Sequence, residues 1–243
     1  MHILKPASFI LAALMCTGLV SCADKTDTKT EGSSPAVAAA EETTEITEKT
    51  TEVASILKNS VDLVRVFSYS GKFVEDGSND RKSNILAAEI TNRGEEYIRL
   101  LEFEISDGTD TYSFSATTLF PGDSVTVLEK NGKEMPEGFT VRSVKATRAV
   151  DFEKQPSLNN AIIRLEEKSG QITVTNISTH DISDVCIYYK AKSNNEYLGG
   201  ITYRVNVGAL KPNEANTVEI SGYSTDNYEI KFTSYENTEA TTQ

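Results

Sequence analysis

The chain has 243 residues and a formal net charge of −12, from 36 acidic and 24 basic side chains, and it contains no tryptophan. The basic residues are not clustered, which argues against a nucleic-acid partner, because phosphate contacts need grouped Lys and Arg. Three cysteines and two histidines leave no Cys/His cluster that suits zinc, so neither a metal nor another cofactor is expected.

The first 21 residues have the features of a secretory signal. A short start carrying Lys5 precedes an apolar run of about 14 residues, which is too short to span a bilayer as a helix. The run closes with Leu19, Val20 and Ser21, directly before a cysteine. We therefore predict a lipoprotein signal at 1–21, with an ordinary cleaved signal or an uncleaved anchor as alternatives.

The tetrapeptide that ends in Cys22 resembles the lipobox of bacterial lipoproteins. The resemblance implies cleavage before Cys22 and a diacylglycerol on its sulfur, often with an acylated amino terminus, and two or three acyl chains hold a protein firmly. Cleavage removes Lys5, so the charge changes from −12 to −13. Anionic lipid repels such a chain, so the lipid anchor must supply the attachment. We expect an extracytoplasmic protein anchored to the bacterial membrane at the cell surface.

Residues 22–57 are predicted to be the lipidated cysteine and a disordered acidic tether. Thr and Glu dominate residues 43–52, and the whole segment lacks aromatic residues. Such a composition cannot bury a core, and its net negative charge favours an extended chain. A marginal helix over 36–57 is the alternative, because alanine and glutamate are good helix formers.

From Val61 the sequence changes to short runs of alternating apolar and polar residues, separated by Gly, Asn, Asp and Pro. This alternation, rich in Val, Ile, Thr, Tyr and Phe, indicates β-strands. The predicted class is all-β, with two tandem Ig-like antiparallel β-sandwich domains at 58–152 and 153–236, a hinge at 152–158 and a disordered tail at 237–243. In the first domain, strands are expected at 61–69, 85–92, 97–106, 111–118, 123–129 and 139–148.

The same alternation predicts which side chains form the two cores. In the first domain these are Leu101, Phe103, Ile105, Tyr112, Phe114, Val125 and Val127. In the second domain they are Val174, Val185, Ile187, Tyr189, Val205, Val207, Val218 and Ile230.

The two predicted domains match each other as copies of one unit. Asn92 and Asn176 lie 84 residues apart, as do Phe103 and Ile187. The second copy then carries seven extra residues within 190–202, because matches further along the chain lie 91 residues apart. Insertions confined to predicted turns are typical of a structural repeat. The other matches are 64–66 with 163–165, Tyr112 with Tyr203, Leu119 with Leu210, and Pro121 with Pro212.

Segments 91–94, 103–108 and 119–122 together resemble the FxLYD-type Ig-like modules of bacterial extracytoplasmic proteins. Ile105 stands where that family has Leu, and Ser106 where it has Tyr. The whole chain also resembles uncharacterised two-module lipoproteins of anaerobic Gram-positive bacteria, especially at 199–203. Such modules have no family-wide catalytic residues, so the resemblance implies an interaction or spacer role.

Few residues suggest catalysis, and no enzyme is expected. His180 is the histidine that remains after cleavage, and Cys186 is the remaining unmodified cysteine. They could act as base and nucleophile, but a solvated turn histidine and a small buried strand cysteine are the simpler interpretations. Residues 75–80 supply several oxygen ligands without the spacing of an EF-hand, so a solvated loop is preferred to a calcium site.

Tyrosine is concentrated in the second domain, which holds seven of the ten. Alternation places Tyr188 outward and Tyr189 inward, and Tyr197 lies on the insertion. Tyr188, Tyr197 and Tyr223 are therefore predicted to form an exposed partner-binding surface, because amphipathic rings are enriched at interfaces. The alternative is that tyrosine is simply a favoured strand residue.

Together these features predict a membrane-anchored extracytoplasmic lipoprotein that acts as a non-catalytic binding or spacer module at the cell surface. A protein or cell-envelope partner is expected, which the sequence does not identify. The alternative is a solute-capturing or transporter-associated lipoprotein. That class usually presents a cleft between α/β lobes, whereas this sequence lacks helical periodicity.

Overall fold

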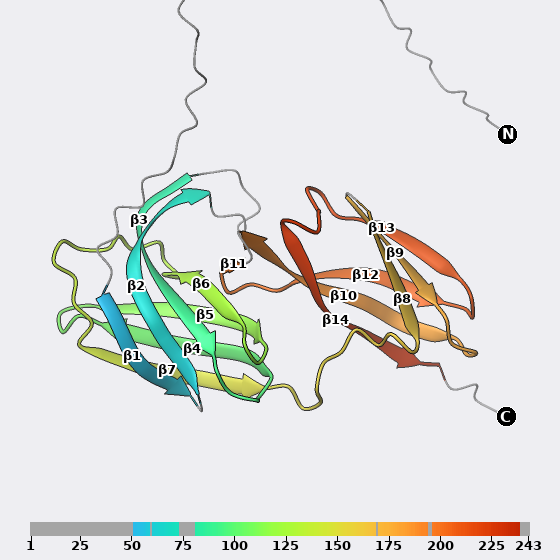
Figure 1. The fold of residues 1–243 in the computed structure, drawn as a ribbon, viewed down its shortest axis with the longest axis horizontal. Helices are drawn as coiled ribbons and strands as arrows, with labels where there is room; N and C mark the ends of the chain where they lie inside the picture. The colour runs from blue at the N-terminus through green and yellow to red at the C-terminus, as the bar shows by residue number, and fades with distance from the viewer. Residues whose placement is uncertain (1–50, 59, 73–80, 169, 194–195, 239–243) are drawn as a thin grey trace, which may run out of the picture. The chain divides into compact units, whose positions relative to one another are not determined.

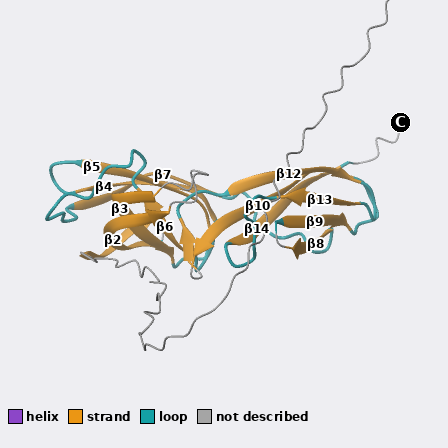
Figure 2. Ribbon diagram, turned by 90° about the horizontal axis from the view of Figure 1, so that it is seen from above, coloured by secondary structure: helices purple, strands orange, loops and turns teal. Residues whose placement is uncertain are grey.

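The computed structural model describes residues 51–58, 60–72, 81–168, 170–193 and 196–238, all within one compact unit. These residues form strands and turns without a helix, so the all-β class is confirmed for this part of the chain (Figures 1 and 2). The strands are β1 Thr51–Lys58, β2 Val61–Lys72, β3 Arg81–Asn92, β4 Ile98–Ser106, β5 Thr111–Leu119, β6 Ser124–Leu128, β7 Ser143–Asp151, β8 Ile163–Lys168, β9 Gln171–Asn176, β10 Ile182–Ser193, β11 Glu196–Leu198, β12 Tyr203–Leu210, β13 Ala215–Glu219 and β14 Tyr228–Asn237.

The strands follow the alternation of the sequence. In β4, Leu101, Phe103 and Ile105 are buried while the residues between them are partly exposed. All seven side chains predicted for the first core are buried. In the second core, Val174, Val185, Ile187, Val207 and Ile230 are buried, whereas Tyr189, Val205 and Val218 are partly buried against them.

Six strands of each repeat pair in the same order. In the first repeat (β2 to β7), β2 pairs with β3, β3 with β6, and β4 with both β5 and β7. In the second repeat (β8 to β10 and β12 to β14), β8 pairs with β9, β9 with β13, and β10 with both β12 and β14. All these pairings are antiparallel. Each repeat is thus β-sandwich-like, with its own hydrophobic core.

A buried asparagine occupies the same position in each repeat, as the last residue of β3 or β9. Asn92 Nδ2 donates hydrogen bonds to two backbone carbonyls, and Asn176 Nδ2 does the same. The acceptors are Glu96 at 2.8 Å and Leu119 at 3.2 Å in the first repeat, and His180 at 2.9 Å and Leu210 at 3.0 Å in the second. This shared geometry matches the predicted equivalence of the two asparagines.

One predicted match between the repeats is wrong. Val61 opposes Asn92, and Ile163 opposes Asn176, so Ile163 corresponds to Val61 rather than to residue 64. The irregularity in β2 between Leu63 and Arg65 has no counterpart in β8. Comparing short apolar runs does not reveal such an irregularity, because a bulge adds a residue without changing the composition.

The boundary of the predicted tether is also wrong at residues 51–57. These residues belong to β1, which pairs antiparallel with β2, with Thr51 opposite Val66. Among the strands of the described residues, β1 has no counterpart in the second repeat, and its Leu57 is buried in the first core. Threonine and valine favour strands once a neighbouring edge is available, which composition alone does not show. The predicted tail is also wrong at Asn237, which is the last residue of β14. Residues 1–50 and 239–243 lie outside the described residues, so the signal, the rest of the tether and most of the tail stay predictions.

Candidate functional site

Several predicted site residues lie outside the described part of the chain. These are Leu19, Val20, Ser21, Cys22 and the oxygen-rich loop 75–80. Within the described residues, no group of three or more His, Cys, Asp or Glu side chains is arranged to hold a metal ion. In the same residues, no helix is long and apolar enough to cross a membrane.

His180 and Cys186 have separate partners. The exposed ring of His180 makes a 3.2 Å contact through Nε2 with Asn237 Oδ1. Cys186 is a free, buried thiol in β10, and its Sγ accepts hydrogen bonds from Arg204 Nε at 3.2 Å and from the Arg204 terminal nitrogen at 3.0 Å. These contacts fit the simpler interpretations of a turn histidine and a buried strand cysteine.

The three tyrosines predicted to form an exposed surface do not do so. Tyr223 is 2% exposed and belongs to the second core, and Tyr197 is 8% exposed and belongs to the first core. Tyr188 is partly exposed and stacks on Phe232, with ring centroids 4.2 Å apart. Of the three, Tyr188 alone is accessible in part.

Burial also changes the chemistry of the two buried phenols. Desolvation raises the pKa of Tyr223 well above its ordinary value of 10.0, and the Tyr223 hydroxyl donates to the Glu167 carboxylate. Desolvation likewise raises the pKa of Tyr197, with a further contribution from Asp123. Both phenols therefore stay neutral near neutral pH.

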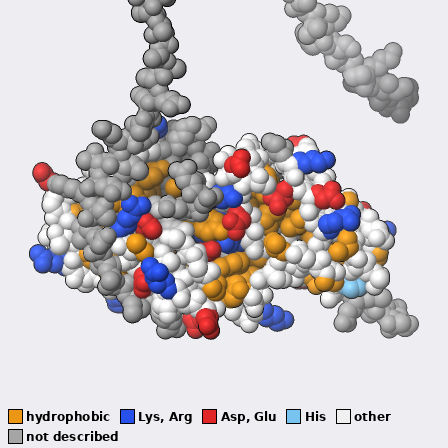
Figure 3. All heavy atoms as spheres, in the orientation of Figure 1, with side chains coloured by type: hydrophobic (Ala, Val, Ile, Leu, Met, Phe, Trp, Pro, Cys, Tyr) orange, Lys and Arg blue, Asp and Glu red, His pale blue; other side chains and the backbone are white. Residues whose placement is uncertain are grey.

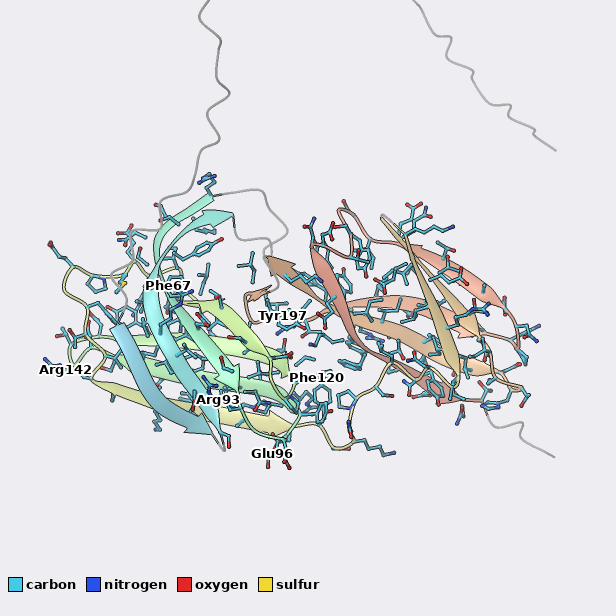
Figure 4. All side chains as sticks on the ribbon, in the orientation of Figure 1. Phe67, Arg93, Glu96, Phe120, Arg142 and Tyr197 are labelled. Carbon is cyan, nitrogen blue, oxygen red and sulfur yellow. The ribbon has the colours of Figure 1, made fainter. Side chains whose placement is uncertain are left out.

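The insertion of the second repeat docks onto the first repeat (Figure 1). β11 pairs with the end of β10, and on its other side it pairs in parallel with β6, with Tyr197 opposite Val125. One sheet therefore runs from β3 and β6 through β11 into β10. The Tyr197 ring enters the first core, and Figure 4 shows this side chain between the two repeats. Through β11 the insertion therefore joins the two repeats.

The segment after β11 continues this contact on the opposite sheet of the first repeat. The carbonyl of Gly200 accepts a hydrogen bond from Thr117 N at 2.5 Å and another from Thr117 Oγ1 at 2.7 Å. A side chain at Gly200 would overlap the backbone of Ser115 and Ala116 in β5. Gly200 is thus a position where close backbone approach requires glycine.

A buried lysine completes the junction. Lys231 in β14 has a side chain 5% exposed, and its Nζ lies 3.0 Å from Asp123 Oδ1 of the first repeat. The same ammonium donates to the Tyr197 hydroxyl at 2.5 Å and lies 4.9 Å from the Phe120 ring centroid. A buried ammonium needs such partners, because an unpaired buried charge is very costly.

Five aromatic rings lie together beside this buried pair, and we call them the junction aromatic surface. The rings are partly exposed, and they come from the turn before β4, the turn after β5, the linker and the outer side of β10 and β14. Their centroids form an unbroken chain of contacts between 4.2 and 6.3 Å. The five residues are Tyr97, Phe120, Phe152, Tyr188 and Phe232.

The linker is held at both ends beside these rings. Phe152 N donates to the Tyr97 carbonyl at 2.9 Å, and Gln155 Nε2 donates to the Tyr97 hydroxyl at 2.7 Å. At the far end, Thr233 N of β14 donates to the Ser157 carbonyl at 3.0 Å. The segment 152–158 predicted as a hinge is therefore fixed to both repeats by hydrogen bonds.

Sequence reasoning missed this surface, apart from Tyr188. Phe120 belonged to a predicted turn and Phe152 to the predicted hinge, where alternation gives no direction for a side chain. A signal was nevertheless present, because Phe120 and Phe152 are large apolar residues next to Pro121 and within the linker, where polar residues are usual. Comparison of the sequence with family models and with curated proteins finds no match.

Proposed function

We propose that this protein is a membrane-anchored extracytoplasmic lipoprotein that acts as a non-catalytic binding or spacer module at the cell surface. The lipobox-like residues Leu19 to Cys22 support the anchor. We further infer that each repeat is an Ig-like sandwich of the FxLYD type. The shared strand pairing and the buried Asn92 and Asn176 support that assignment.

The observation that carries the spacer role is the docking of β11 against β6. Tandem modules joined only by a linker reorient freely, and such a pair does not hold a fixed span. Here the insertion places Tyr197 in the first core, and Lys231 pairs with Asp123 across the same junction. The two repeats then act as one stiff body that presents its surface at a defined distance from the end of the tether.

We assign to the two docked repeats a binding role rather than catalysis. His180 and Cys186 engage different partners, Asn237 and Arg204, so neither is positioned by the other as a base and nucleophile would be. We propose a protein or cell-envelope partner. The alternative of a solute-capturing or transporter-associated lipoprotein has no particular contact in its favour.

The anchor is tested with Cys22→Ala in a Gram-positive host, with Cys16→Ala as the matched control. Cys16 lies within the predicted signal, so its replacement should leave lipid labelling and membrane fractionation unchanged. Cys22→Ala should abolish labelling with an alkyne fatty acid and release folded protein into the medium. It should also fail to complement a deletion strain that the wild type complements. A released Cys22→Ala protein that restores the phenotype would contradict the proposal.

A further inference from the structure

We propose that the junction aromatic surface binds a lysine- or arginine-rich segment of a partner protein. The inference rests on the proposed binding function and names the chemistry of its partner. It follows from the exposure of the five rings, from the charges beside them, and from a lysine that the protein already holds against one of them.

The rings provide the contact area. Phe120 touches Tyr97, Phe152 and Phe232, at centroid distances of 5.0, 6.2 and 6.3 Å, so it lies at the centre of the surface. Figure 4 shows Phe120 at the boundary between the repeats, and Figure 3 shows hydrophobic side chains gathered at that place on the molecular surface. Rings held this way bury area at little further cost in conformational entropy.

The charges beside the rings are mainly acidic. Glu95 and Glu96 directly precede Tyr97, and Asp151 and Glu153 flank Phe152; all four are exposed. The hydrogen bond from Phe152 N to the Tyr97 carbonyl brings these two short segments together. Figure 4 shows Glu96 near Phe120, at the edge where Figure 3 shows acidic side chains. Lys154, next to Glu153, is also exposed, so the rim is predominantly rather than wholly acidic. A predominantly acidic rim favours a partner of the opposite sign.

The protein already contains the interaction that a cationic partner would make. The Lys231 ammonium lies 4.9 Å from the Phe120 centroid and 4.4 Å from the Tyr197 centroid, and it pairs with Asp123. An aromatic face with a carboxylate nearby thus holds an ammonium within this junction. Aromatic faces attract Lys and Arg side chains because the ring quadrupole is negative above the plane. The outer rings, with the exposed carboxylates of Glu95 and Glu153 beside them, present the same combination of groups at the surface.

The test measures binding of a fluorescent peptide of alternating lysine and serine to the mature full chain in a zwitterionic detergent. A peptide of alternating glutamate and serine is the comparison ligand. The acidic rim is neutralised with Glu95→Gln/Glu153→Gln, and the rings are tested with Phe152→Leu, which keeps the apolar volume. Glu137→Gln/Glu236→Gln is the matched control, because both residues are exposed and lie in the β6–β7 loop and near the end of β14.

We expect the lysine peptide to bind, with affinity that falls as salt is raised, and the glutamate peptide not to bind. The rim variant and Phe152→Leu should each weaken binding roughly fivefold, and the control should bind like the wild type. Circular dichroism melting curves check that each variant is folded. Equal weakening by the control, wild-type affinity in Phe152→Leu, or no binding of the lysine peptide would each overturn the proposal.

Failure of this inference can be separated from failure of the proposed function. The peptide assay uses purified protein and does not depend on membrane attachment. If the lysine peptide fails to bind while Cys22→Ala still abolishes labelling and complementation, the surface assignment is wrong and the anchored function stands. If Cys22→Ala complements fully while the lysine peptide binds, the anchored function is wrong and the surface assignment stands.

Discussion

The buried asparagines are the most informative single residues, because they make equivalent hydrogen bonds in both repeats. Asn92 is 1% exposed and Asn176 is fully buried. Each amide donates to one carbonyl in the following turn and to one at the end of a strand. Each Oδ1 accepts a backbone N–H, from Gly94 or from Ser178. These turns therefore depend on a side chain that supplies donors and an acceptor together.

Removing either asparagine amide should destabilise the protein strongly. Asn92→Ala and Asn176→Ala leave buried carbonyls without donors, so each should lower the free energy of unfolding by about 2–4 kcal/mol. Urea denaturation followed by circular dichroism measures the loss. Asn160→Ala, at an exposed turn position, is the control and should change stability by less than about 0.5 kcal/mol. Similar losses in all three variants would contradict the assignment.

The raised pKa of Tyr223 predicts how the stability of the fold changes at alkaline pH. Its pKa is raised in the folded protein by burial and by the hydrogen bond to Glu167. A group whose pKa is higher when folded stabilises the fold fully below its unfolded pKa, here near 10.0, and that stability is lost as the pH rises above it. Tyr223→Phe should remove part of this dependence.

The measurement is the urea midpoint of wild type and Tyr223→Phe, from neutral pH to above pH 10.0. The wild-type midpoint should fall more steeply than that of the variant at the alkaline end. Parallel curves for the two proteins would show that the buried phenol does not contribute.

At the level of the element, the short strand β11 connects the two repeats by pairing with a strand of each. Its three residues pair with β6 on one side and β10 on the other, and Gly200 follows against β5. The segment thus covers edges of both sheets of the first repeat. Covered edges resist further strand pairing, which protects a β-protein from aggregation.

Gly200→Ala should dislodge this segment, because the added methyl group overlaps the Ser115 carbonyl. The Thr117 amide then loses its acceptor, and its hydrogen exchange should accelerate at least about tenfold. Gly71→Ala is the control, since a methyl group there meets the movable end of the Tyr69 side chain. An unchanged Thr117 exchange rate in Gly200→Ala would mean that the backbone contact does not hold the segment.

Alternation in the sequence predicts the strands of the first repeat well, but it does not predict which segments cover the edges of its sheets. Alternation located the six strands of the first repeat, because their inward residues share one core. It missed β1, whose Thr and Glu content is that of a flexible chain. It also gave the wrong environment for Tyr197 and Tyr223. Tyr223 lies in a turn, where alternation has no meaning, and Tyr197 is buried by the other repeat.

At the level of the whole molecule, the duplication was visible in the sequence but the junction was not. Matching offsets identify equivalent strands within each repeat. Contacts between repeats, such as Lys231 with Asp123 or Phe120 with Phe232, join residues more than a hundred positions apart. No local pattern encodes such contacts, so the junction and its aromatic surface could not be predicted from the sequence.

The last prediction concerns the ion pair at that junction. Lys231→Met leaves the Asp123 carboxylate without its cation. Asp123→Asn keeps an acceptor for Phe120 N but leaves the Lys231 ammonium with only the more distant Glu229 carboxylate, at 3.4 Å. Breaking a buried pair from one side costs about 3–5 kcal/mol, because the remaining charge stays desolvated. The two single variants should therefore be much less stable than the wild type.

The double variant Lys231→Met/Asp123→Asn removes both charges and should recover part of this loss. A double-mutant cycle from urea denaturation should give a coupling energy of at least about 1 kcal/mol. Spin labels on β4 and β9 report the span between the repeats: each single variant should broaden that distance distribution, and the double variant should narrow it again. Additive losses with an unchanged distribution would show that the other contacts between the repeats hold the junction, and that the ion pair has no part in its stiffness.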